Sequence, residues 1–219
     1  MCDTTRKCDV CKQQIPITRN NIHGIAKLKT LFYHTECLTE WAQDRVQRKG
    51  HAKHWEFALA NMAACEEDAR KAIERRFVQD DFHMYLLKTY DVIDIDHRFW
   101  TVVNLLEQGE YRKRKCNPVS METLFGAWRW GQEKLDKIDR NNKMKGVGPQ
   151  TGMARINYDL TVLINKVPIY LKEKAKREVE AAEVIIQKQN DIKIDYSTIK
   201  ANKKSDGLGD ISDLLDELI

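Results

Sequence analysis

The stretch LFYHTECLTEW, residues 31–41, decides how the first part of this chain folds, because it holds a histidine and a cysteine three residues apart. A second pair lies upstream in RKCDVCKQQ, residues 6–14. Together the pairs form the pattern C-x2-C-x22-H-x2-C, made by Cys8, Cys11, His34 and Cys37. A tight turn lets two sulfurs reach one ion, and one helical turn places both side chains of H-x2-C on the same side. The pattern predicts a closed, structural Zn²⁺ site rather than a catalytic one.

The distribution of apolar residues predicts a reducing compartment for this chain. No run reaches the roughly 18 apolar residues of a membrane span, and the first residues lack the apolar region of a secretory signal. We therefore expect a cytoplasmic protein that does not bind a membrane and whose cysteines are ligands or free thiols. Cys2 is a competing ligand but precedes the turn at the terminus, and Cys65 and Cys116 have no partner pair nearby.

Helical periodicity dominates the rest of the chain and predicts a mainly α fold. The module at residues 6–50 ends in a helix, and any strands should be confined to it. Further helices are predicted over 54–77, 81–92, 97–109, 120–140 and 156–189. The predicted domains are a treble-clef-like zinc-binding module at 6–50, a helical domain at 51–189, and a linker with a flexible acidic tail at 190–219.

Three local signals refine this prediction. Ser120 is a candidate N-cap for its helix. Pro168 lies inside the last apolar pattern and should kink or divide that helix. The acidic segment DVIDID, residues 91–96, could hold a hard cation, but we favour an acidic turn that caps the following helix.

The charge is unevenly distributed along the chain. The formal net charge is +4, but the last 14 residues hold four Asp, one Glu and no base, so residues 1–205 carry +9. Within the loop predicted at residues 110–118, YRKRK puts four positive charges in a row. The candidate nucleic-acid contacts are Arg112, Lys113, Arg114, Lys115 and Arg129. The alternative is a solvated loop, with Trp128 and Trp130 split between core and surface.

The C-terminal segment DISDLLDELI has an amphipathic pattern. Its apolar face consists of Ile211, Leu214, Leu215 and Leu218, and its acidic residues lie off that face. A ten-residue helix is marginal alone in water, so we expect it to fold in a groove on a protein partner. The alternative is docking onto the chain's own body.

The cysteine pattern resembles the first zinc-binding half of a LIM domain and, more broadly, a treble-clef finger. The resemblance covers residues 8–37 and carries over to the four metal-ligand candidates alone, because no further C-x2-C follows Cys37. The overall layout, with AWRWGQEKLDKI at 127–138 and RINYDLTVLINK at 155–166, is similar to uncharacterised proteins of phages, prophages and conjugative elements of Gram-positive bacteria. That similarity implies the cytoplasm of a bacterial host and brings no activity with it.

The sequence contains no Walker loop, GxGxxG, GxSxG or plausible Cys-His-Asn set, so we expect a protein that is not an enzyme. The first hypothesis is a zinc-finger adaptor that binds nucleic acid through its basic helical body and a protein through its tail. The second is a pure protein-interaction module, regulatory or inhibitory and phage-encoded. A third, a nuclease using the DVIDID carboxylates, is the least favoured.

Overall fold

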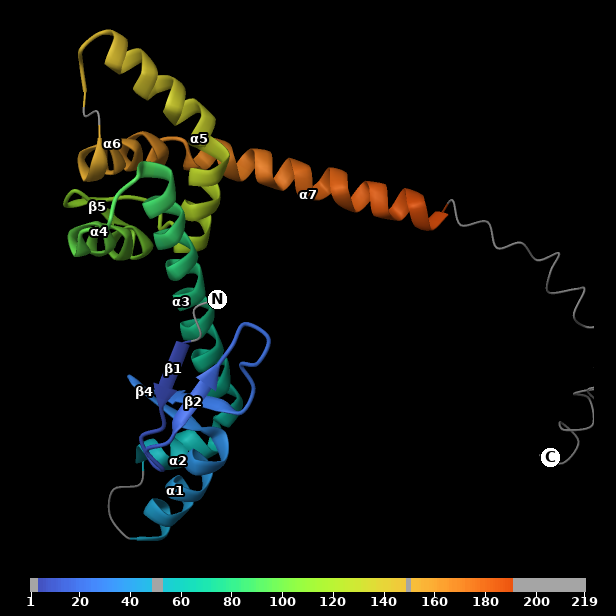
Figure 1. The fold of residues 1–219 in the computed structure, drawn as a ribbon. Helices are drawn as coiled ribbons and strands as arrows, with labels where there is room; N and C mark the ends of the chain where they lie inside the picture. Colours follow the sequence, from blue (N-terminus) through green and yellow to red (C-terminus); the bar gives the residue numbers. More distant parts are fainter. Residues whose placement is uncertain (1–3, 49–52, 149–150, 191–219) are drawn as a thin grey trace, which may run out of the picture. The chain divides into compact units, whose positions relative to one another are not determined.

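The computed structural model describes residues 4–48, 53–148 and 151–190 (Figure 1). Its helices are α1 Thr35–Gln47, α2 Lys53–Ala60, α3 Met62–Tyr90, α4 His97–Glu107, α5 Met121–Met144, α6 Gly152–Ile164 and α7 Val167–Asn190. Its strands are β1 Thr4–Lys7, β2 Gln14–Ile17, β3 Ile25–Leu28, β4 Leu31–His34, β5 Glu110–Tyr111 and β6 Arg114–Lys115. The prediction of a mainly α chain with a small N-terminal module of strands is confirmed. None of the described helices combines the length and the apolar character that crossing a membrane requires.

The chain divides into two compact units, Met1–Tyr170 and Leu171–Ile219. The boundary falls within α7, so the two parts of that helix belong to different units. The first unit contains the strands, helices α1 to α6 and both apolar cores. Of the second unit, the structure describes the helical residues 171–190.

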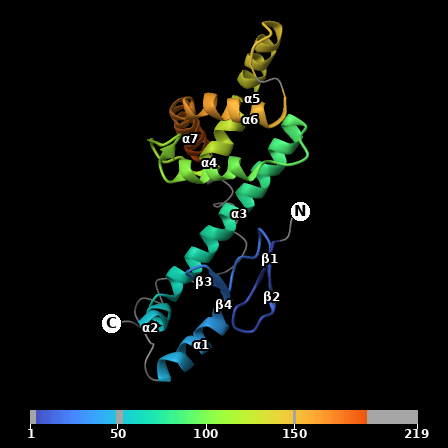
Figure 2. The same ribbon diagram turned by 90° about the vertical axis from the view of Figure 1, so that its left-hand side faces the viewer.

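The N-terminal module consists of two antiparallel hairpins followed by a helix. β1 pairs with β2, and β3 pairs with β4. Side chains alternate along β2, where Ile15 and Ile17 are buried and their neighbours exposed, as expected for a strand with one face on a core. α1 adds Leu38 to the same small core. Figure 2 shows the two hairpins and α1 beside the first half of α3.

The second core lies among the helices α3 to α6, with the start of α7. Trp128 is fully buried there and makes edge contacts with the rings of Phe82 and Phe99. α5 approaches its neighbours closely, because a Cβ at Gly131 would lie 2.9 Å from the Leu163 side chain of α6. The large aromatic and aliphatic side chains of these helices thus form the larger of the two apolar cores among the described residues.

Helix α3 contributes to both cores. Its first half places Cys65, Ala69, Ile73 and Phe77 in the core of the N-terminal module. Its second half places Phe82, Leu86 and Tyr90 in the helical core. One continuous helix therefore connects the strands with the helical bundle (Figure 1).

The prediction of two helices over 54–77 and 81–92 placed the break between them wrongly. The break lies at Asn61, whose backbone leaves the helical region and whose side-chain amide donates to the carbonyl of Phe57 at 2.9 Å. No break occurs near residue 80, because neither glycine nor proline interrupts residues 62–90 and buried side chains continue across that point. The helix ends at Asp91, which adopts a left-handed conformation.

The expectation that strands are confined to the cysteine module was also wrong. Residues 110–115 form the hairpin β5–β6 instead of a loop. Its two turn residues, Arg112 and Lys113, both have positive φ, as a two-residue turn of this kind requires. The usual Asn-Gly signal is missing there, so the sequence pattern gave no indication of the turn.

The capping predictions are confirmed. The Ser120 side chain accepts from the backbone N–H of Thr123 at 3.1 Å and starts α5, which runs on to Met144. In DVIDID, Asp96 accepts from the N–H of Arg98 at the start of α4, and Asp94 accepts from the N–H of Ile95. The last pattern divides between Ile164 and Val167, so Pro168 occupies the first turn of α7, where its missing N–H costs nothing.

Candidate metal centre

The turn between β1 and β2 presents the first cysteine pair. The backbone N–H of Cys8 donates to the carbonyl of Gln13 at 2.9 Å, and the N–H of Lys12 donates to the carbonyl of Cys8 at 3.0 Å. Lys12 has a φ of 62°, which reverses the chain tightly after Cys11. The sulfur of a buried Cys8 and that of an exposed Cys11 therefore lie on one side of the turn.

The junction of β4 and α1 presents the second pair. His34 is the last residue of β4 and the N-cap of α1, and Cys37 lies in the first helical turn. The backbone N–H of Thr35 donates to the carbonyl of Gly24 at 2.9 Å, which fixes this junction against the start of the β3–β4 hairpin. The N–H of Asp9 donates to the carbonyl of Phe32 at 3.1 Å, so the two hairpins are joined at the site.

The four candidate ligands converge on one point. Their donor atoms all lie within 4.8 Å of one another, and no other group of this kind occurs among the residues that the structure describes. The Nδ1 atom of His34 lies 3.4 Å from the Cys11 sulfur and 3.7 Å from the Cys37 sulfur. A tetrahedral ion with Zn–N and Zn–S bonds of usual length would separate nitrogen and sulfur by about 3.6 Å. The Cys3His group thus fits a single tetrahedral metal ion.

The thiols influence each other's ionisation strongly. Burial opposes the thiolate of Cys8, but hydrogen bonds from the backbone of Cys11, His34 and Val10 outweigh it and lower the pKa of Cys8 to about 6. Burial, the Cys11 thiol and the Cys8 charge raise the pKa of Cys37 to about 12. Several thiolates at this distance repel one another, and a bound divalent cation would offset that repulsion.

The centre is also joined to the long helix. The Thr35 hydroxyl, next to the candidate ligand His34, donates to a carboxylate oxygen of Glu66 on α3 at 2.9 Å. Cys65 is buried under the module and takes no part in the ligand group. The described cysteines, which are Cys8, Cys11, Cys37, Cys65 and Cys116, are all free in this structure.

The predicted nucleic-acid residues fall on two elements. Arg112, Lys113, Arg114 and Lys115 are exposed on the β5–β6 hairpin. Arg112 donates to the Thr161 hydroxyl of α6 at 3.0 Å, and the Tyr111 hydroxyl lies 3.0 Å from the same atom. Arg129 is exposed on α5, and its guanidinium carbon lies 5.8 Å from the centre of the Phe125 ring. The hairpin is therefore held on α6 through Thr161, whereas Arg129 contacts Phe125 of its own helix.

The two tryptophans beside Arg129 have different environments. Trp128 is fully buried and donates from its ring nitrogen to the Tyr90 hydroxyl at 2.9 Å. Trp130 is half-buried, and its ring lies 5.9 Å from that of Tyr170. The two tryptophans thus differ in burial, as the solvated-loop alternative supposes, and Trp128 is removed from any contact with a ligand.

The helical core contains a buried polar network that the sequence did not predict. The Tyr90 hydroxyl donates to Asp159, which is buried, at 2.7 Å, and Arg155 reaches Asp159, Asp139 and Asp136 with its guanidinium. The Arg155–Asp159 spacing of four residues on one helix was the available signal. Because polar residues at this spacing are ordinary on exposed faces, only the packing of α3, α5 and α6 identifies them as internal.

Comparisons of the chain with protein-family models, with curated proteins and with solved structures find no match. The resemblances to half a LIM domain and to mobile-element proteins therefore stay interpretations of the residues. The predicted partner-binding side chains Ile211, Leu214, Leu215 and Leu218 lie outside the described residues, as does Cys2.

Proposed function

We propose that this chain is a non-enzymatic zinc-finger adaptor, which binds nucleic acid through its basic helical body and recruits a protein partner through its C-terminal tail. The observation that carries the proposal is the β5–β6 hairpin. Four consecutive cations are exposed on it, and none of them forms an ion pair with any residue in the described part of the chain.

Four cations in the first half of α3 differ from those of the hairpin, because each has a carboxylate partner. Arg70 pairs with Glu67 and Glu74, and Arg75 pairs with Glu107. Arg76 and Lys71 likewise pair with carboxylates. Charge that is already neutralised contributes little to binding a polyanion, whereas unpaired Lys and Arg release counterions from phosphates. The hairpin, with four such cations in a row, is therefore a better candidate for phosphate contacts than these α3 cations.

The aromatic surroundings favour phosphate contacts over base stacking. The guanidinium of Arg112 lies 5.3 Å from the centre of the Tyr111 ring and covers one side of it. The Tyr111 hydroxyl is engaged with Thr161, and Trp128 is internal. We expect binding that depends weakly on base sequence, since phosphate contacts carry no sequence information directly.

Zinc is the metal that the donor set supports best. Three thiolates and one imidazole suit Zn²⁺, and four protein ligands leave no open coordination position. A closed site has a structural role, in which metal binding supplies folding free energy to the N-terminal module. DVIDID gives no support to the nuclease hypothesis, because two of its carboxylates are occupied in capping and local turns.

Neutralising the hairpin tests the nucleic-acid interface. Replacing Arg112, Lys113, Arg114 and Lys115 by Gln should weaken binding to single- and double-stranded DNA and RNA. It should also reduce the steepness of the slope of log K against log salt concentration. The reduction should be about 0.7 to 0.9 for each lost phosphate contact. A salt-titrated binding assay with the zinc-loaded chain measures both quantities.

The matched control replaces Arg70, Lys71, Arg75 and Arg76 of α3 by Gln. It makes the same change in net charge at cations that already have carboxylate partners. If both variants lose equal affinity, the overall charge rather than the hairpin drives binding. If the unmodified chain binds no nucleic acid even at low salt, the nucleic-acid function is rejected. A module that binds only proteins is then the remaining hypothesis.

Deleting residues 206–219 tests the tail. We expect a nearly unchanged melting temperature and nucleic-acid binding that is not weakened, because the deleted residues carry a net charge of −5. The protein that the full chain captures from a bacterial extract should be lost. The reason is that the segment is joined by a polar linker and has its own apolar face. A large fall in melting temperature would indicate that the tail docks on its own chain, and Leu214→Asp should reproduce whichever effect is found.

A further inference from the structure

The second compact unit contains an exposed apolar stripe along α7. Leu171, Ala175, Val179, Ala182 and Ile186 follow each other at spacings of 4, 4, 3 and 4 residues, which places them on one face of the helix. All five are exposed. Single exposed apolar residues are ordinary, but a continuous stripe at helical spacing indicates a surface that another helix covers.

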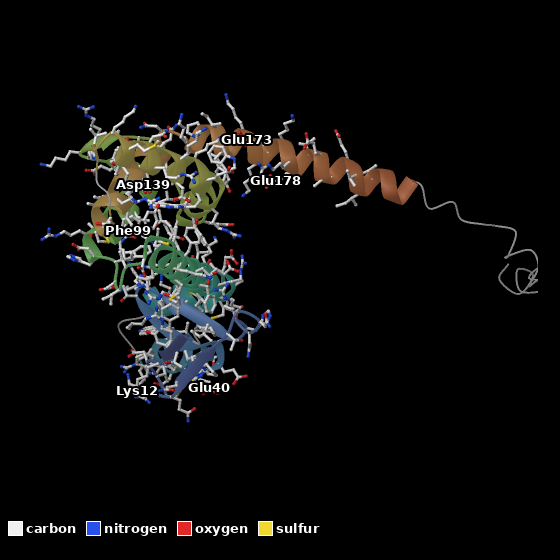
Figure 3. The ribbon with its side chains drawn as sticks, turned by 45° about the horizontal axis from the view of Figure 1, so that its top comes forward. Lys12, Glu40, Phe99, Asp139, Glu173 and Glu178 are labelled. Atoms are coloured by element: carbon white, nitrogen blue, oxygen red, sulfur yellow. The ribbon has the colours of Figure 1, made fainter. Side chains whose placement is uncertain are left out.

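The charges of the same segment are separated along the helix. Residues 171–177 hold three Lys, one Arg and one Glu, for a net charge of +3. Residues 178–186 hold three Glu and no base, for a net charge of −3. The segment contains ion pairs four residues apart, such as Lys174 with Glu178 and Arg177 with Glu173, at 3.8 and 3.6 Å. Figure 3 shows the α7 side chains, with Glu173 and Glu178 labelled.

We propose that residues 171–190 pair in antiparallel orientation with the same segment of a second copy of this chain. In that orientation the basic half of each helix lies along the acidic half of the other, whereas a parallel pair would align like charges. The charge pattern thus identifies the occupant of the stripe as a second copy.

The order of side chains in the stripe is self-complementary. A two-fold axis between residues 178 and 179 places Leu171 opposite Ile186 of the second copy and Ala175 opposite Ala182. Large side chains then meet large ones near the ends, and the alanines allow close approach between them. Val179 lies next to its own symmetry copy at the centre.

The charged edge of the stripe fits the same arrangement. Lys172 and Lys176 border the stripe on the side that also bears Glu180 and Glu183. Antiparallel pairing brings the two lysines of one helix alongside the two glutamates of the other. Glu178 borders the opposite side near the axis and is paired with Lys174 of its own helix. An interface of this length is small, so we expect a weak dimer with a dissociation constant in roughly the micromolar range.

Sedimentation of the zinc-loaded full chain tests the proposal. A concentration-dependent monomer–dimer equilibrium is expected, and Val179→Asp should weaken it by at least roughly tenfold, because two carboxylates would meet at the axis. Val184→Asp is the matched control, since Val184 lies off the stripe on the same helix and is 47% exposed, against 57% for Val179. A chain that stays monomeric to about 100 times the expected constant, or equal effects of the two variants, would overturn the proposal.

Two further variants test the orientation and the occupant. Lys172→Glu should weaken the dimer by placing like charges together, and adding Glu183→Lys should restore it. Failure of the double variant to restore dimerisation would reject the antiparallel register. If the full chain is monomeric but a chain without residues 206–219 dimerises, the acidic tail covers the stripe, and the second copy is rejected as its occupant in the full chain.

Discussion

The Cys37→Ser variant should lose its bound metal and unfold the N-terminal module, while the helical core stays folded. Serine keeps the size of cysteine but is a poor zinc ligand, so the tetrahedral group would lose one of its four donors. Structural zinc in finger peptides supplies roughly 10 kcal/mol or more of folding free energy, and a module of fewer than 50 residues has little other apolar burial to replace it. Metal analysis by native mass spectrometry should find about one zinc per chain in the unmodified protein and close to none in the variant.

Hydrogen exchange should show where the variant unfolds. Exchange should accelerate at residues 4–48 and in the first half of α3, because Cys65, Ala69, Ile73 and Phe77 would lose the module that covers them. The second half of α3 should keep its protection through Phe82, Leu86 and Tyr90 in the helical core. Cys116→Ser is the matched control, since this cysteine is half-buried and outside the ligand group, and it should keep the metal. Unchanged metal content in Cys37→Ser would show that Cys37 is not a metal ligand and would contradict the proposed site.

The Cys3His group of the candidate metal centre could be predicted from the sequence because its spacing is local. Each ligand pair has an internal spacing that one turn or one helix start enforces, so Cys8 with Cys11 and His34 with Cys37 can be recognised in isolation. The caps at Ser120 and Asp96 were predictable for the same reason, since a cap involves residues two or three apart. The mainly α fold likewise followed from helical periodicity.

The features that sequence reasoning missed depend on contacts between distant residues. The β5–β6 hairpin lacks a turn signal of its own, and its Arg112 and Tyr111 are held by Thr161, about 50 residues further on. The continuity of α3 is set by two separate cores that bury its successive halves. The helical periodicity of residues 62–90 does not reveal that two different partners cover it.

The buried network at Asp159 leads to the second large expected effect. Asp159 is 1% exposed, and its carboxylate accepts from the Tyr90 hydroxyl and lies 3.5 Å from the Nε of Arg155. The same hydroxyl accepts from the buried Trp128 ring. Burial raises the pKa of Asp159, while Tyr90 and Arg155 oppose that rise and favour the carboxylate. The buried negative charge of Asp159 is therefore stabilised by Tyr90 and Arg155, and both of these side chains use its carboxylate as a partner.

Asp159→Ala should lower the free energy of unfolding of the helical core by about 3 to 5 kcal/mol, the usual cost of removing one partner from a buried charged pair. The variant leaves the Tyr90 hydroxyl without its acceptor and Arg155 without one of its three carboxylates. Urea unfolding followed by circular dichroism measures the change. Asp159→Asn should lose less, because the amide oxygen still accepts from Tyr90.

Asp136→Ala is the matched control for this experiment. Asp136 pairs with the same Arg155, but its side chain is 46% exposed, so water replaces much of what is removed. We expect a loss of about 1 kcal/mol or less there, as for other exposed ion pairs. Equal losses in Asp159→Ala and Asp136→Ala would show that burial of the carboxylate does not set the cost. The difference between them therefore measures how strongly the helical core depends on the internal network that joins α3, α5 and α6.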